Sequence, residues 1–259
     1  MSHYSNRPRS SRADEMLGKI FPVLSGQGHL ILADYLGSDA SVARGARCSY
    51  GDSNKSFHED ARLIRFLMRH AHTSPFEQVS FLFHLRLPFF LSQQFSRCRA
   101  AKSQLVWPKG ELEFWLPKQM EESLYTFYEE ARTVIKMAKE RGGSLETCLA
   151  FAPGTFIVDL VWQIDLHNLC YFIRSRREGA SPEMKEFLQE LTCCLEAVAP
   201  CSFSAFTDYI IKGRLLHQKE SQEISRNLSA IAKEQIEQEA QAIGMAPGEI
   251  QEFFKKFLI

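Results

Sequence analysis

The segment QVSFLFHLRLPFFLSQQFSRCR, residues 78–99, changes its hydrophobic period at Pro88. Every second residue is apolar from Val79 to Leu87, which predicts a strand with one buried face. A proline suits the first turn of a helix, so we expect a helix over Phe89–Arg99. The segment therefore predicts a strand that passes directly into a helix.

A second pair of the same kind lies further along the chain. GTFIVDLVWQI, residues 154–164, again alternates apolar and other residues, and Asp165 can cap a helix over 166–177. Amphipathic periodicity also predicts helices over 57–72, 120–141 and 181–200. Since strands and helices mix along one domain, we expect the α+β class, with a mixed sheet and packed helices.

The ends of the chain differ in composition from its middle. Residues 1–16 contain arginines but no apolar core, so we expect a disordered tail and no secretory signal. Residues 17–215 form the expected domain, in which Asp39 is placed to cap a short helix. Residues 216–259 are expected to be a C-terminal helical extension, with one charged amphipathic helix from about Glu220 to Ile243.

Composition excludes several classes of function. The formal net charge is zero, so bulk attraction to nucleic acid is not expected. No apolar run approaches the roughly 20 residues that span a bilayer, which predicts no membrane insertion. The seven cysteines form no CxxC pair, a pattern typical of reduced thiols in the cytoplasm rather than of a metal site.

The spacing of Arg97 and Arg99 raises a question of charge. Two like charges so close repel each other unless an anion or a carboxylate lies between them, although both side chains can also be solvated. His72, Ser74 and Glu77 are polar site candidates, but Ser74 and Glu77 also fit a capping box. Three more arginines end the helix over 166–177, where they either complement the helix dipole or bind a ligand.

From Lys19 to Lys212 the order of segments resembles the flavin-dependent thymidylate synthases. The resemblance rests on FPVLSGQGHLILADYLGSDASVARGARCSYG, on LIRFLMRHAHTSPFEQVSFLFHLRLPFFLSQQFSRCR and on VWQIDLHNLCYFIR. It implies a homotetramer of α+β fold, or a mixed tetramer with a paralogue. It also implies FAD bound between subunits, with electrons from NADPH and a one-carbon unit moved from methylenetetrahydrofolate to dUMP.

That family's signature, Arg-His-Arg, then seven residues, then serine, is altered here. It reads Arg97-Cys98-Arg99, with Trp107 at the serine position. The resemblance implies three functional sets. The catalytic set is Arg97, Cys98 and Arg99; the flavin set is Ser49, His72, Ser74, Glu77, Arg97, Arg99 and Arg176; the substrate set is Gln94, Trp107, Lys109 and Lys185.

Other departures fall on the nucleotide side. Asp159 stands where the family has an arginine, and Ala180 where it has a histidine that contacts flavin. Losing two charge-assisted contacts costs about 3–6 kcal/mol of nucleotide binding, so we expect dUMP methylation to be weak or absent. A nucleophilic role for Cys98 requires that the arginines lower its pKa. Three hypotheses stay open: a working synthase, a paralogue acting on another pyrimidine or small molecule, and a non-catalytic flavin subunit beside an active paralogue.

Overall fold

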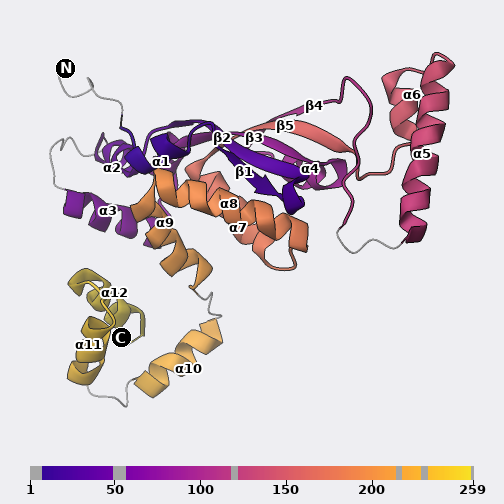
Figure 1. Ribbon diagram of the computed structural model, residues 1–259. Helices are drawn as coiled ribbons and strands as arrows, with labels where there is room; N and C mark the ends of the chain where they lie inside the picture. Colours follow the sequence, from indigo (N-terminus) through magenta and orange to yellow (C-terminus); the bar gives the residue numbers. More distant parts are fainter. Residues whose placement is uncertain (1–7, 49–56, 118–121, 214–217, 229–232, 258–259) are drawn as a thin grey trace. The chain divides into compact units, whose positions relative to one another are not determined.

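The computed structural model describes residues 8–48, 57–117, 122–213, 218–228 and 233–257. The chain divides into two compact units, Met1–Lys212 and Gly213–Ile259. Figure 1 shows their helices and strands. The strands are β1 (Ile20–Val23), β2 (Gly28–Leu36), β3 (Ser80–Pro88), β4 (Lys102–Val106) and β5 (Ile157–Asp165). The helices of the first unit are α1 (Ser11–Met16), α2 (Asp39–Cys48), α3 (Phe57–Arg69), α4 (Phe89–Ser96), α5 (Glu122–Glu140), α6 (Leu145–Ala150), α7 (Leu166–Arg177), α8 (Pro182–Val198) and α9 (Pro200–Phe206).

The sheet has the order β1-β2-β3-β5-β4. Each described pairing is antiparallel, so the expected α+β class is confirmed while the sheet is antiparallel rather than mixed. The two strand–helix pairs predicted from sequence form β3–α4 and β5–α7, and they place β3 and β5 side by side in the middle of the sheet. The short edge strands β1 and β4 were not predicted.

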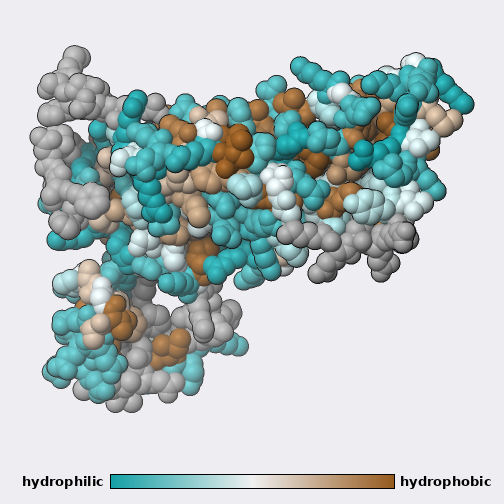
Figure 2. Space-filling model, in the orientation of Figure 1, coloured by the Kyte–Doolittle hydropathy of each residue, from teal (hydrophilic) through white to brown (hydrophobic). Residues whose placement is uncertain are grey.

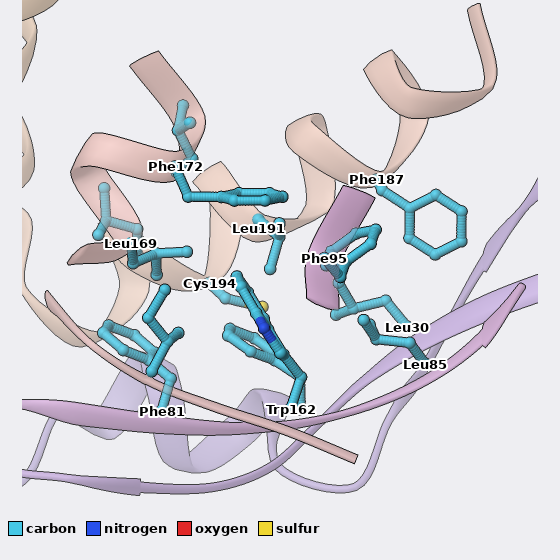
Figure 3. Close-up of a cluster of buried hydrophobic side chains, with 14 of the residues drawn as sticks. Leu30, Phe81, Leu85, Phe95, Trp162, Leu169, Phe172, Phe187, Leu191 and Cys194 are labelled. Carbon is cyan, nitrogen blue, oxygen red and sulfur yellow. The ribbon is translucent and has the colours of Figure 1, made fainter. Parts of the chain in front are cut away.

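One face of the sheet carries the core. The alternate residues of β3 and β5, including Phe81 and Trp162, are fully buried beneath α7 and α8, as Figure 3 shows. Phe95 of α4 joins them: its ring lies 5.2 Å from that of Trp162, edge to face. Phe172 of α7 lies 5.0 Å from Trp162. This aromatic cluster fixes α4 and α7 against each other, and both helices carry predicted site residues.

Asp39 has a different partner from the one expected. Its carboxylate accepts hydrogen bonds from the backbone N–H of Cys201 at 2.7 Å and of Ser202 at 2.9 Å, and from the Ser202 hydroxyl at 2.6 Å. These groups belong to the first turn of α9, whose free N–H groups need acceptors. Asp39 therefore caps α9, far away in sequence, and not the helix α2 that it begins.

The N-terminal segment is ordered further toward its start than we expected. Ser10 caps α1 and its hydroxyl donates to the carbonyl of Ala197 at 2.6 Å. Ala13 is completely buried. The prediction of a disordered tail to residue 16 was therefore wrong from Ser10 onward, because this short helix packs on α8.

The second unit is helical. It contains α10 (Gln218–Leu228), α11 (Lys233–Ala242) and α12 (Pro247–Phe257), with Ile236, Ala240 and Ile250 buried. The helix expected from about Glu220 to Ile243 covers most of α10 and all of α11. Residues 229–232 lie outside the described residues, so the continuity of that helix stays a prediction. On the face shown in Figure 2 the described residues are mostly hydrophilic, with scattered apolar patches.

Candidate functional site around the end of α4

The Arg97-Cys98-Arg99 segment forms the turn between α4 and β4. The Arg97 N–H donates to the carbonyl of Gln93 at 3.2 Å, and the Cys98 N–H donates to that of Phe95 at 3.0 Å. A further backbone bond, from Ala101 N–H to the Cys98 carbonyl at 3.0 Å, closes the turn. Both arginine side chains are exposed, and no carboxylate of the described residues pairs with either of them. Two unpaired cations, separated by Cys98, thus lie on a turn whose backbone is fixed by three hydrogen bonds.

Arg176 approaches the same helix from α7. Its Nη2 donates to the carbonyl of Gln94 at 3.3 Å, and its guanidinium lies 5.8 Å from the centre of the Phe172 ring. Its Nε is buried and has no hydrogen-bond partner among the residues that the structure describes. Leaving a buried donor unsatisfied costs about 1–3 kcal/mol, which an added acceptor would recover. The structure thus brings Arg176 to Gln94, one turn before Arg97, through the backbone of Gln94 rather than its side chain.

The Cys98 thiol has a raised pKa. Burial is the largest cause, opposed by hydrogen bonds from the backbone of Ala101 and Ala100. A thiol with a raised pKa is protonated at neutral pH and is a poor nucleophile. The direction of this shift argues against activation of Cys98 by the neighbouring arginines, and a protonated S–H is a weak hydrogen-bond donor.

A second group of candidates lies between α3 and β3. His72 lines a pocket of about 210 Å³ with His167 and Arg174 of α7. Ser74 and Glu77 are exposed on a short 3-10 helix, η3 (Ser74–Gln78), that packs on α7. No side chain among the described residues caps this helix, so the predicted capping box is not formed.

Trp107 and Lys109 lie in a third region of the structure, away from the two groups described above. Both line a pocket of about 860 Å³ that is bounded by β4, the loop after it, α5 and α6. The Trp107 ring lies 5.8 Å from that of Phe89 and 6.3 Å from that of Phe156, and 42% of the residue is exposed. Trp107 thus packs on the domain with one side and is accessible on another. Lys185 lies elsewhere, in the first turn of α8.

Asp159 is engaged within the sheet. It stands opposite Arg86 in the β3–β5 pairing, with 3.7 Å between Asp159 Oδ2 and Arg86 Nη1. The Nη2 of Arg86 lies 2.7 Å from a carboxylate oxygen of Glu113. His29 is the neighbour of Arg86 on β2, and burial lowers the pKa of its imidazole, while Asp159 opposes that shift. Sequence reasoning missed Arg86 and Glu113. The alternation along β3 did place Arg86 on the face opposite the core.

Two further sequence expectations concern metals and membranes. Within the described ranges, no group of three or more His, Cys, Asp or Glu side chains is placed to hold a metal ion. A search of the same residues finds no helix both long and apolar enough to cross a membrane. Ser49, expected on the flavin side, lies outside the described residues.

Comparison with known protein families identifies the domain. The sequence model described as "Thymidylate synthase complementing protein" matches residues 31–201. The chain belongs to this family. The matched segment of the thymidylate synthase complementing protein domain runs from β2 into α9 and contains the Arg97-Cys98-Arg99 turn, Trp107 and Arg176. The resemblance deduced from sequence is thereby confirmed.

Individual family members agree with this assignment. The flavin-dependent thymidylate synthase of Thermus thermophilus is 29% identical over 259 residues, covering 91% of this chain and 94% of that protein. The enzyme of the same name from Treponema pallidum is 31% identical over 227 residues, covering 76% and 74%. Among solved structures, the UMP/dUMP methylase PolB from Streptomyces cacaoi, bound with 5-Br dUMP, is similar in fold. Its TM-score is 0.64 at 22% identity, over 70% of this chain and 95% of PolB.

Proposed function

We propose that this family member binds FAD and uses it to methylate dUMP or a related pyrimidine nucleotide, with NADPH and methylenetetrahydrofolate as cosubstrates. One observation carries the proposal: two unpaired arginines, Arg97 and Arg99, lie one turn from the place where Arg176 meets α4. The names of the relatives point the same way, since they are flavin-dependent thymidylate synthases.

The residues present suit the chemistry of FAD. Its pyrophosphate is anionic, and arginines bind such oxygens through several N–H donors held in one plane. The buried Nε of Arg176 has no partner among the described residues and is a further donor for an acceptor. Ser49, His72, Ser74 and Glu77 complete the proposed flavin set. When bound, FAD supplies the redox chemistry that such a methylation needs. Within that site Arg97 and Arg99 neutralise negative charge, and the protonated Cys98 offers a weak donor.

The residues proposed to bind the substrate are expected to hold the nucleotide weakly. Gln94, Trp107, Lys109 and Lys185 are assigned to the nucleotide, and Trp107 offers an accessible ring for a base. Asp159, by contrast, adds a negative charge where a nucleotide phosphate would need a positive one. Two missing charge-assisted contacts cost about 3–6 kcal/mol, or roughly 10²–10⁴ in affinity. The proposed activity toward dUMP is therefore low.

A second candidate function is a non-catalytic flavin subunit that pairs with an active paralogue. Its support is that Asp159 takes part in a local charge cluster with Arg86 and Glu113.

In either case we propose a tetramer, homomeric or mixed, because the proposed flavin residues are spread over separate elements and a neighbouring chain would complete the site. The seven cysteines are all free, which fits a reducing compartment such as the cytoplasm.

The test is the visible absorbance of the purified protein. We expect a flavin band that is lost in the double variant Arg97→Ala/Arg99→Ala and that shifts when dUMP is added to the unmodified protein. The matched control is Arg9→Ala/Arg141→Ala, which removes two exposed arginines elsewhere and should keep the band. Circular dichroism checks that each variant is folded. A folded Arg97→Ala/Arg99→Ala protein that retains its full flavin content would refute the proposal.

A further inference from the structure

The Trp107 loop, residues 107–112, leaves the sheet after β4 and then returns to it. β4 pairs with β5 as far as Val106. The chain meets β5 again at Glu113, whose carbonyl accepts a hydrogen bond from the Ile157 N–H at 2.8 Å. Both ends of the loop that carries Trp107 are therefore attached to β5.

The side chain of Gln27 holds the chain a second time just after this loop. Its Nε2 donates to the carbonyl of Leu116 at 2.9 Å, and the Leu116 N–H donates to its Oε1 at 3.0 Å. The amide of Gln27 thus satisfies both backbone groups of Leu116, as a neighbouring strand would. Gln27 directly precedes β2, which β3 separates from β5 in the sheet. The segment from Glu113 to Leu116 therefore joins two strands that are not neighbours.

The turn that presents Gln27 is strained. It includes the short 3-10 helix η2 (Leu24–Gly26) and joins β1 to β2. Leu24 and Ser25 have φ angles of 55° and 60°, in the left-handed region that is unfavourable for residues with a side chain. Leu24 is buried, and its N–H donates to a carboxylate oxygen of Glu186 on α8 at 2.7 Å. Strain of this kind persists only where the surroundings enforce it, and it concentrates at functional positions.

We infer that Gln27 is a positioning residue for the proposed nucleotide site, acting through the backbone of Leu116 to hold the Trp107 loop in place. The inference rests on the proposed function for the role of Trp107, whereas nothing in that proposal involves Gln27. A loop that is fixed before the ligand arrives loses less conformational freedom on binding, and so binds more tightly. Since Gln27 acts only through the loop, its effect on binding should depend on Trp107.

Hydrogen exchange followed by mass spectrometry tests the attachment without any ligand. Gln27→Met keeps the length of the side chain and removes both hydrogen bonds. Peptides that contain the N–H groups of Trp115 and Leu116 should then exchange about three- to thirtyfold faster, and peptides from β3 should not change. The control Gln189→Met replaces another exposed glutamine, on α8, and should change neither region. Unchanged exchange at Trp115 and Leu116 in folded Gln27→Met would overturn the inference.

Calorimetric titration with dUMP tests the consequence for the site. In Gln27→Met the dissociation constant should rise about three- to tenfold, while the flavin band is kept because the proposed flavin residues are intact. In Gln27→Glu one carboxylate oxygen can still accept from the Leu116 N–H, so the rise should be smaller. When Trp107→Ala is already present, adding Gln27→Met should change the dissociation constant by less than about twofold.

Two results of the titration would overturn the inference. One is an equal rise in the dissociation constant with and without Trp107, which would show a general effect on stability. The other is an unchanged dissociation constant in Gln27→Met when Trp107 is intact. If no variant binds dUMP, the proposed substrate is refuted, and the exchange measurement still decides whether Gln27 holds the loop.

Discussion

Replacing Asp159 by arginine tests the nucleotide side of the proposed site. Asp159 is the cross-strand neighbour of Arg86 and lies 3.7 Å from it. The change removes an ion pair between side chains that are 54% and 27% exposed, which contributes about 0.2–1 kcal/mol. It also places like charges directly opposite each other in a sheet, at a similar cost. We expect the melting temperature to fall by about 1–8 °C, since Glu113 still pairs with Arg86 at 2.7 Å.

The affinity for dUMP should rise in Asp159→Arg, although the stability of the variant falls. If position 159 faces the phosphate of dUMP, one new charge-assisted contact adds about 1.5–3 kcal/mol, or roughly 10–150-fold in affinity. The assay is a dUMP titration that follows the flavin absorbance and is repeated by calorimetry. Asp159→Asn is the control, because it removes the negative charge without adding a positive one. An arginine variant that is folded yet binds dUMP no more tightly than the asparagine variant would show that position 159 does not face the nucleotide.

Further predictions concern stability. Asp39→Ala should destabilise the domain by about 3–5 kcal/mol in chemical denaturation, because it leaves buried N–H groups of α9 without an acceptor; a loss below about 1 kcal/mol would argue against that cap. Burial lowers the pKa of His29, so stability should be complete above its ordinary value of about 6.5 and decline as the pH falls below it. His29→Gln should flatten that decline, and an unchanged pH profile would contradict the reasoning. Ala71 has a φ of 54°, so Ala71→Gly should be neutral or stabilising by up to about 1 kcal/mol, and clear destabilisation would refute the assignment of strain.

The central strands and their helices were predictable because each carries its own signal. The alternation in β3 and β5 and the capping Asp165 are local, and the Asp165 side chain does accept from the Asn168 N–H at 2.9 Å. β1 and β4 gave no such signal, because they are short edge strands whose pairing depends on distant partners. Asp39 shows the same limit: its type predicted a cap, but only the tertiary fold decides which helix it caps.

The candidate site also has some features that the sequence predicts and others that only the tertiary fold reveals. The spacing of Arg97 and Arg99 pointed to an anion, and the structure adds that both are unpaired among the described residues. Sequence did not reveal that Arg176 reaches α4 or that burial raises the pKa of Cys98, since both depend on how α7 and the sheet surround the turn. Nor did it show that Gln27 binds the backbone of Leu116, because the two residues are 89 positions apart in the chain.

Tritium release from dUMP labelled at carbon 5 tests the central claim most directly. The assay contains the purified protein, FAD, NADPH and methylenetetrahydrofolate, and the Thermus thermophilus relative is measured beside it. We predict release that requires FAD, NADPH and methylenetetrahydrofolate, with a kcat/KM roughly 10²–10⁴ below that of the relative because of the missing phosphate contacts. A kcat/KM equal to the relative's would contradict this account of the nucleotide site, and release that continues without flavin would contradict the proposed function itself.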